Sequence, residues 1–88
     1  MTAALGNYLT VHSRALVLSD LAESYVLTKE IEEACRLLGE AFDVGVQLRS
    51  DRVLTRVRQV RRELAPWKDM HAVRELEERL VGGFLGNF

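Results

Sequence analysis

The chain has 88 residues, of which 48% are hydrophobic and 28% charged, and its formal net charge at pH 7 is -1. This length fits one small domain, and the apolar content excludes a disordered chain. The near balance of charge argues against a protein that nucleic acid holds by overall charge, and the single cysteine, Cys35, excludes an internal disulfide.

The first predicted helix spans residues 13–27, after a lead-in of residues 1–12. Its apolar side chains recur at the i, i+3, i+4 and i+7 spacing that lines one helical face, and they are Leu18, Leu21, Ala22 and Tyr25. Thr28 is expected to cap the second helix, residues 29–46, and three early glutamates there suit the positive end of the helix dipole. The inward positions of this helix are Ile31, Ala34, Leu38 and Ala41.

Two more helices follow in the second half of the chain. Ser50 is the expected cap of the third, and Pro66 should end it. Its buried stripe is predicted to be Val53, Val57, Val60 and Leu64. Asp69 is the candidate cap of the fourth, whose stripe is Met70, Val73, Leu76 and Leu80. Gly82 and Gly83 are expected to stop that helix and release an apolar tail, residues 82–88. No stretch alternates with the period of a strand.

Large and small apolar groups alternate through the first two helices, so that alanines of one helix can receive bulky side chains of the other. This is the layout of a tetratricopeptide repeat over residues 15–48, with a degenerate terminal repeat over residues 50–81. The predicted fold is therefore all-α, with antiparallel hairpins stacked as a short right-handed superhelix of about four helices. An ordinary helical hairpin that meets the pattern by chance is the alternative.

Residues 12–80 also resemble a known family. The segments LRSDRV and RRELAPW, with AVRELEERL after them, are similar to the C-terminal tetratricopeptide-like region of bacterial helix-turn-helix transcriptional regulators of the XRE type. The resemblance implies a region that receives a peptide, small-molecule or protein signal, or mediates self-association, without a cofactor. DNA contact belongs to the other domain of such regulators, and the segment before His12 is too short to hold it. We therefore expect a remnant, a truncated frame or a free-standing partner of a regulator.

Charge is distributed unevenly along the chain. Residues 20–43 carry seven acids against two bases, whereas residues 49–62 carry six arginines against one aspartate. In the simplest interpretation, the basic helix lies alongside the acidic hairpin and the two fields complement each other. In a second interpretation the first helices of the repeats form a binding surface in which arginines hold a carboxylate. The residues of that surface would be Leu16, Ser19, Glu23, Val26, Leu54, Arg58, Arg61 and Arg62.

A third interpretation assigns the arginines to nucleic-acid phosphates, but aromatic side chains do not alternate with them. Its residues would be Arg52, Arg56, Arg58, Arg61 and Arg62.

The partner expected from the other interpretations is a protein or peptide, or a second copy of the chain that stacks on an apolar end. The side chains that would cover or form that end are Tyr8, Leu9, Phe84, Leu85 and Phe88.

Other residues give no sign of catalysis. Cys35 is expected to be a buried, inert thiol, and the separated His12 and His71 lack the spacing of metal ligands. Trp67 should fill the gap between the third and fourth helices, or else anchor a partner. We expect neither enzymatic activity nor a bound metal. We also expect a cytoplasmic location, because the sequence shows neither a membrane span nor an export signal.

Overall fold

The computed structural model describes the backbone of residues 3–87 and the side chains of residues 10–82. Within residues 3–87 the chain forms four α-helices, one short 3-10 helix and no strand, which confirms the predicted all-α class. The elements are α1 (Ala3–Leu27), α2 (Ile31–Leu48), α3 (Asp51–Glu63), η1 (Ala65–Trp67) and α4 (His71–Asn87). No helix in the described part is both long and apolar enough to cross a bilayer.

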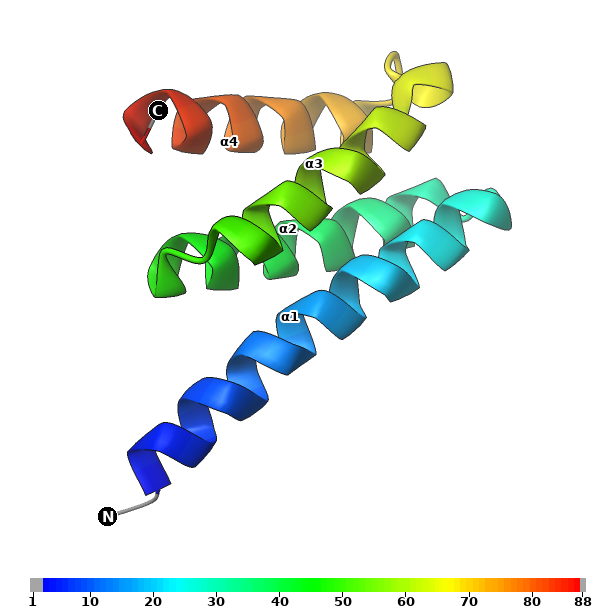
Figure 1. Ribbon diagram of the computed structural model, residues 1–88. Coiled ribbons are helices and arrows are strands. Elements are labelled where there is room, and N and C mark those ends of the chain that lie inside the picture. Colours follow the sequence, from blue (N-terminus) through cyan, green and yellow to red (C-terminus); the bar gives the residue numbers. More distant parts are fainter. Residues whose placement is uncertain (1–2, 88) are drawn as a thin grey trace.

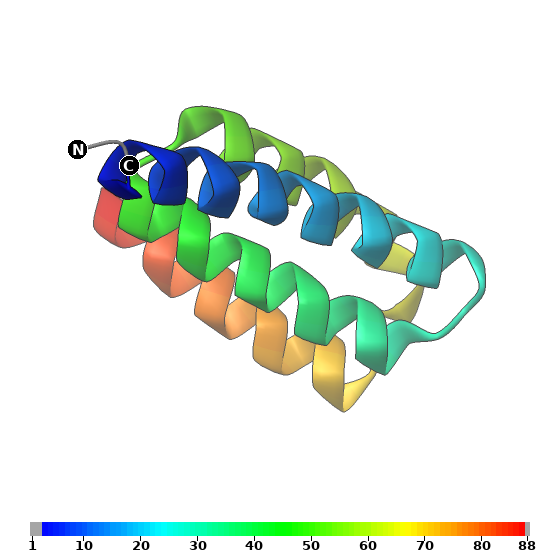
Figure 2. The same cartoon turned by 90° about the horizontal axis from the view of Figure 1, so that it is seen from below.

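Helix α2 is the centre of the arrangement. It packs against α1, α3 and α4, and α1 also packs against α3. Successive helices run in opposite directions, with α4 on the side of α2 away from α1 (Figures 1 and 2). Helices α3 and α4 approach each other much less closely than either approaches α2. The first hairpin is therefore closed along its length, whereas the second opens between its two helices.

One apolar cluster that draws on all four helices forms the core. Most of the predicted inward positions are buried, namely Ala22, Ile31, Ala34, Leu38, Ala41, Val53, Val57, Val60 and Leu76. Leu18 and Tyr25 are partly buried against this cluster. Leu21 was expected inside, but it is 45% exposed. The inward line of α1 runs through Ala15, Ala22 and Val26, and Leu21 is rotated about 100° from Ala22.

Both ends of the helical region extend beyond the predicted limits. α1 begins at Ala3 rather than at residue 13, because residues 3–12 contain no proline and only one glycine. α4 continues through Gly82 to Asn87, so the predicted tail is helical up to that residue. Glycine weakens a helix by about 1 kcal/mol but does not stop it. The side chains proposed to cover an apolar end lie outside those described.

One of the three predicted helix caps is confirmed, and the other two are wrong. Ser50 caps α3, since its Oγ accepts a hydrogen bond from the Val53 amide at 3.2 Å. The cap position of α2 is Glu30 rather than Thr28, whose hydroxyl bonds to the Tyr25 carbonyl and the Glu30 carboxylate. Met70 rather than Asp69 precedes α4, and its carbonyl accepts from the Arg74 amide. Cap assignments from sequence alone thus place these helix starts within a few residues.

Candidate functional site: a basic groove between α3 and α4

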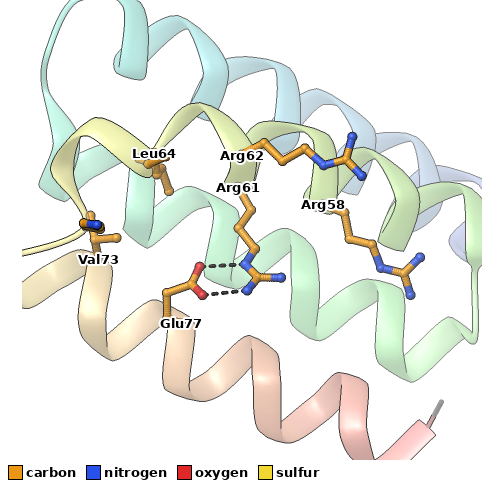
Figure 3. A pocket seen from close by; sticks show the side chains of 8 residues that line it. Arg58, Arg61, Arg62, Leu64, Val73 and Glu77 are labelled. Atoms are coloured by element: carbon orange, nitrogen blue, oxygen red, sulfur yellow. Dashed lines mark hydrogen bonds and ion pairs between the residues drawn. The ribbon is translucent and has the colours of Figure 1, made fainter.

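The opening between α3 and α4 forms a groove of about 460 Å³ (Figure 3). Its apolar floor includes Leu64 and Val73, both of which are buried. Its charged walls carry four cations and one carboxylate, which are Arg58, Arg61, Arg62, Lys68 and Glu77. We call this site the α3–α4 groove. The positive balance of charge on its walls favours an anionic ligand, and its floor can accept apolar atoms of the same ligand.

Arg61 and Glu77 bridge the two walls of the groove. Nε and Nη2 of Arg61 each donate to a different oxygen of Glu77, and both distances are 2.6 Å. The pair is about one third exposed on each side. This two-pronged contact is the geometry in which a guanidinium binds a carboxylate most strongly.

Two other cations of the groove are more open to solvent than Arg61. Lys68 and Arg62 are exposed, and Arg58 is partly buried. Figure 3 shows Arg61 reaching toward α4, whereas Arg62 extends away from Glu77. No ion pair of Arg62 or Lys68 is found among residues 10–82. These two side chains thus keep their charge available at the edge of the groove.

The structure divides the predicted binding surface. Arg58, Arg61 and Arg62 lie together, but the four predicted residues of α1 do not line the α3–α4 groove. Ser19 is fully buried, and its hydroxyl donates to the Ala15 carbonyl at 3.0 Å. A serine in a helix can satisfy its hydroxyl in this way, so it needs no ligand.

The remaining positions expected on that surface are also covered or engaged within the fold. Val26 is only 4% exposed, Leu54 is buried, and Leu16 is partly buried against the core. Glu23 binds Arg56 at 2.8 Å. These residues face the core or the contact between α1 and α3, so this half of the predicted set does not line the α3–α4 groove.

Arg56 joins the basic helix to the acidic first hairpin. It donates to Asp20 at 2.8 and 3.0 Å and to Glu23 at 2.8 Å. The hydrogen bonds that Arg56 donates to Glu23 and Asp20 raise the pKa of its guanidinium. Arg56 and Arg61 lie five positions apart, about 140° around α3, so one faces α1 and the other faces α4. For Arg56 the simplest interpretation of the charge pattern holds, because its two acids belong to the acidic hairpin, whereas Arg61 pairs with Glu77 of α4, outside residues 20–43.

The sequence did not predict two of the residues that line the groove, Lys68 and Glu77. The spacing of acids on one helix says nothing of the neighbouring helix, so the sequence could not assign Glu77 to the groove. Lys68 follows the Pro66-Trp67 turn, and only the course of η1 brings it to the groove. No sequence signal identified either residue.

The residues considered for other chemistry lie away from the groove. Burial, with a smaller contribution from Glu32, raises the pKa of the Cys35 thiol to about 11, so the thiolate is scarce at neutral pH. His12 Nε2 lies 2.9 Å from Ser50 Oγ, where it supports the start of α3. Among the described residues no three acidic, histidine or cysteine side chains gather as metal ligands would.

Comparisons of the chain with known protein families, characterised proteins and solved structures found no match.

Proposed function

We propose that this chain is a protein-interaction module that binds an acidic segment of a partner protein in the α3–α4 groove. The observation that carries the proposal is the combination of four cationic side chains and a buried apolar floor in one open groove. A peptide supplies both kinds of group, since its carboxylates match the cations and its aliphatic atoms match the floor.

The size and chemistry of the groove support a peptide as the ligand. Its volume of about 460 Å³ falls within the range of ligand sites, roughly 300 to 1,000 Å³. Arg61 already holds a carboxylate of the chain itself with both donors. A ligand carboxylate can use the same donors, while Lys68 adds a less directional charge nearby.

The wider role follows from the resemblance of residues 12–80. We propose a tetratricopeptide-like module that acts in the cytoplasm as the signal-receiving or oligomerising part of a bacterial transcriptional regulator. The acidic segment then belongs to a partner protein or to a second copy of the chain. The alternating directions of α1 to α4 and the closed first hairpin support a repeat-like stack.

The arginine pairs weigh against direct nucleic-acid binding. Of the five arginines that such binding would use, Arg56 and Arg61 are already neutralised by acids on α1 and α4. Breaking the Arg56 pairs would cost part of the energy gained from phosphates, whereas a peptide in the α3–α4 groove meets only the Arg61–Glu77 pair. We infer that a phosphate backbone is a poorer ligand than an acidic peptide.

Binding of a labelled peptide of glutamate and serine tests the proposal, with glutamine replacing glutamate in the control peptide. Replacing two groove cations together, Arg58→Gln with Lys68→Gln, should weaken binding by about tenfold or more. Arg52→Ala is the matched control, since Arg52 is exposed on α3 but does not line the groove. It should leave peptide binding unchanged.

Three results would overturn the proposal. The first is equal binding of the glutamine peptide, and the second is an equal loss of affinity in Arg52→Ala. The third is tighter binding of duplex DNA than of the acidic peptide, with a steep dependence on salt.

A further inference from the structure

A second hollow lies beside the α3–α4 groove, where the turn after α1 meets η1. Its volume is about 380 Å³. Four apolar residues line it, namely Val26, Leu27, Pro66 and Trp67. Val26 is buried and forms the floor, whereas Leu27 is 74% exposed. We call this site the Trp67 hollow.

The apolar lining of the Trp67 hollow is partly open to solvent. Trp67 is only partly buried and Pro66 is exposed, so ring atoms of both face solvent. The sequence left two roles open for Trp67, filling the gap between α3 and α4 or anchoring a partner. In the structure it packs partly on the core and also lines this hollow. A rigid aromatic side chain beside an open leucine is the composition typical of the centre of a protein interface.

Arg62 connects the two sites. It lines both the Trp67 hollow and the α3–α4 groove. The rim of the hollow carries the cations Arg62 and Lys29 against the single acid Glu63. One ligand that crosses Arg62 therefore meets positive charge at both sites, which favours the same acidic segment over a neutral apolar one.

We propose that the Trp67 hollow receives a bulky apolar side chain, such as leucine or phenylalanine, from the acidic segment that binds the α3–α4 groove. This inference rests on the proposed function and adds the feature that gives it specificity. The acidic residues are held by the groove, and the apolar residue next to them covers Leu27 and Trp67. The recognised sequence is thus acidic with one large apolar anchor, rather than acidic alone.

The expected gain in affinity follows from the apolar surface that the anchor removes from water. Full burial of a leucine side chain corresponds to a change in affinity of about tenfold or more, from which the ordering of the peptide takes a part. We therefore expect an anchored peptide to bind about tenfold more tightly than the same peptide without its anchor.

The single tryptophan of the chain provides a direct measurement. Two peptides are titrated, one of glutamate and serine, and one in which a terminal serine is replaced by leucine. The leucine peptide should bind about tenfold more tightly and shift the emission of Trp67 to shorter wavelength, because the ring loses contact with water. The serine peptide should bind without that shift.

The Leu27→Ser variant tests the Trp67 hollow independently of the α3–α4 groove, because Leu27 lines only the hollow. The variant should lose most of the preference for the leucine peptide while binding the serine peptide as before, and the high exposure of Leu27 should leave the fold intact. Leu21→Ser is the matched control, because Leu21 is also an exposed leucine of α1 but does not line the hollow.

The outcomes separate the two proposals. If the leucine peptide binds no more tightly than the serine peptide, or if its higher affinity persists in Leu27→Ser, the Trp67 hollow is not the anchor site. The proposal that the α3–α4 groove binds an acidic segment would still hold. If neither peptide binds, both proposals fall.

Discussion

Arg61 and Glu77 face each other across the α3–α4 groove, with two contacts of 2.6 Å between the guanidinium and the carboxylate. Glu77 therefore occupies the donors that would bind an incoming acidic ligand. Because the pair is about one third exposed, its net contribution to stability is small, below about 1 kcal/mol. A ligand must displace Glu77 or share Arg61 with it, so this acid is expected to limit the affinity of the site.

Replacement of Glu77 by glutamine should strengthen ligand binding. The Glu77→Gln variant leaves the guanidinium of Arg61 without its carboxylate and removes the one negative charge from the walls of the groove. We expect the affinity for the glutamate-serine peptide to rise by about tenfold, which corresponds to about 1.4 kcal/mol. Fluorescence anisotropy of the labelled peptide measures this change.

The control for this prediction is Glu78→Gln, which removes the same charge from a neighbouring exposed position of α4. It should change the affinity far less, because Glu78 does not line the α3–α4 groove and its exposed charge is largely solvated. Weaker binding by Glu77→Gln would contradict the prediction and would show that Glu77 supports the ligand rather than competing with it.

Arg56 is expected to contribute more to stability than the other exposed arginines of α3. Its guanidinium bonds two acids of α1, and its side chain is only 24% exposed. Arg56→Ala should lower the free energy of unfolding by about 1 kcal/mol, and the loss should shrink at high salt. Urea denaturation measures both. Arg52→Ala should stay within about 0.5 kcal/mol of the wild type, and an equal loss in the two variants would refute the assignment.

Glu23 and Glu63 should make stability depend on pH in opposite directions. The hydrogen bond with Glu63, and then that with Arg56, lowers the pKa of Glu23 from its ordinary value of 4.5. Its contribution to stability is therefore present above 4.5 and is lost as the pH falls through the lowered pKa. The hydrogen bond with Glu23 raises the pKa of Glu63, so its contribution is present below 4.5 and is lost as the pH rises through the raised pKa.

Glu63→Gln tests this pair, because the amide can donate to Glu23 at every pH. The variant should be more stable than the wild type at neutral pH, by less than about 1 kcal/mol. The difference should vanish as the pH falls through the raised pKa of Glu63. Chemical denaturation across that interval checks the sign. A variant that is less stable at neutral pH would show that the two carboxyl groups do not share a proton.

Gly45 and Gly82 should respond oppositely to alanine. A Cβ at Gly45 would lie 2.9 Å from atoms of both Val53 and Leu54, which are buried and cannot move freely. Gly45→Ala should therefore lower the stability by about 1 to 2 kcal/mol, despite the better helix propensity of alanine. Among the atoms that the structure describes, none lies within 4 Å of a Cβ at Gly82, so Gly82→Ala should raise the stability by up to about 1 kcal/mol. Thermal unfolding of both variants distinguishes packing from propensity.

The apolar spacing predicted the four helices because burial dominates their stability. Val53, Val57 and Val60 repeat with the helical period, and all three are fully buried. The ends of α1 and α4 were harder to predict, since a cap or a glycine contributes only about 1 kcal/mol and the continuing helix outweighs it. Leu21 was misplaced because several apolar residues of α1 allow two choices of inward face.

The candidate site was predicted only in part. A cluster of arginines on α3 was visible in the sequence, and Arg58, Arg61 and Arg62 do share the groove. Which acids would neutralise them depends on the helices that flank α3. The place of Glu77 therefore follows from tertiary structure, since no local pattern links it to Arg61.

The contacts of Arg56 with α1 and of Arg61 with α4 depend on the length of α3 between the two arginines. Arg56 reaches α1 and Arg61 reaches α4 only because five positions of helix separate them. Insertion of one residue between them would rotate one contact by about 100° relative to the other. The number of residues in α3 between Arg56 and Arg61 thus sets the relative direction of the two contacts. We expect α3 to tolerate insertions far less readily than the turns on either side of it.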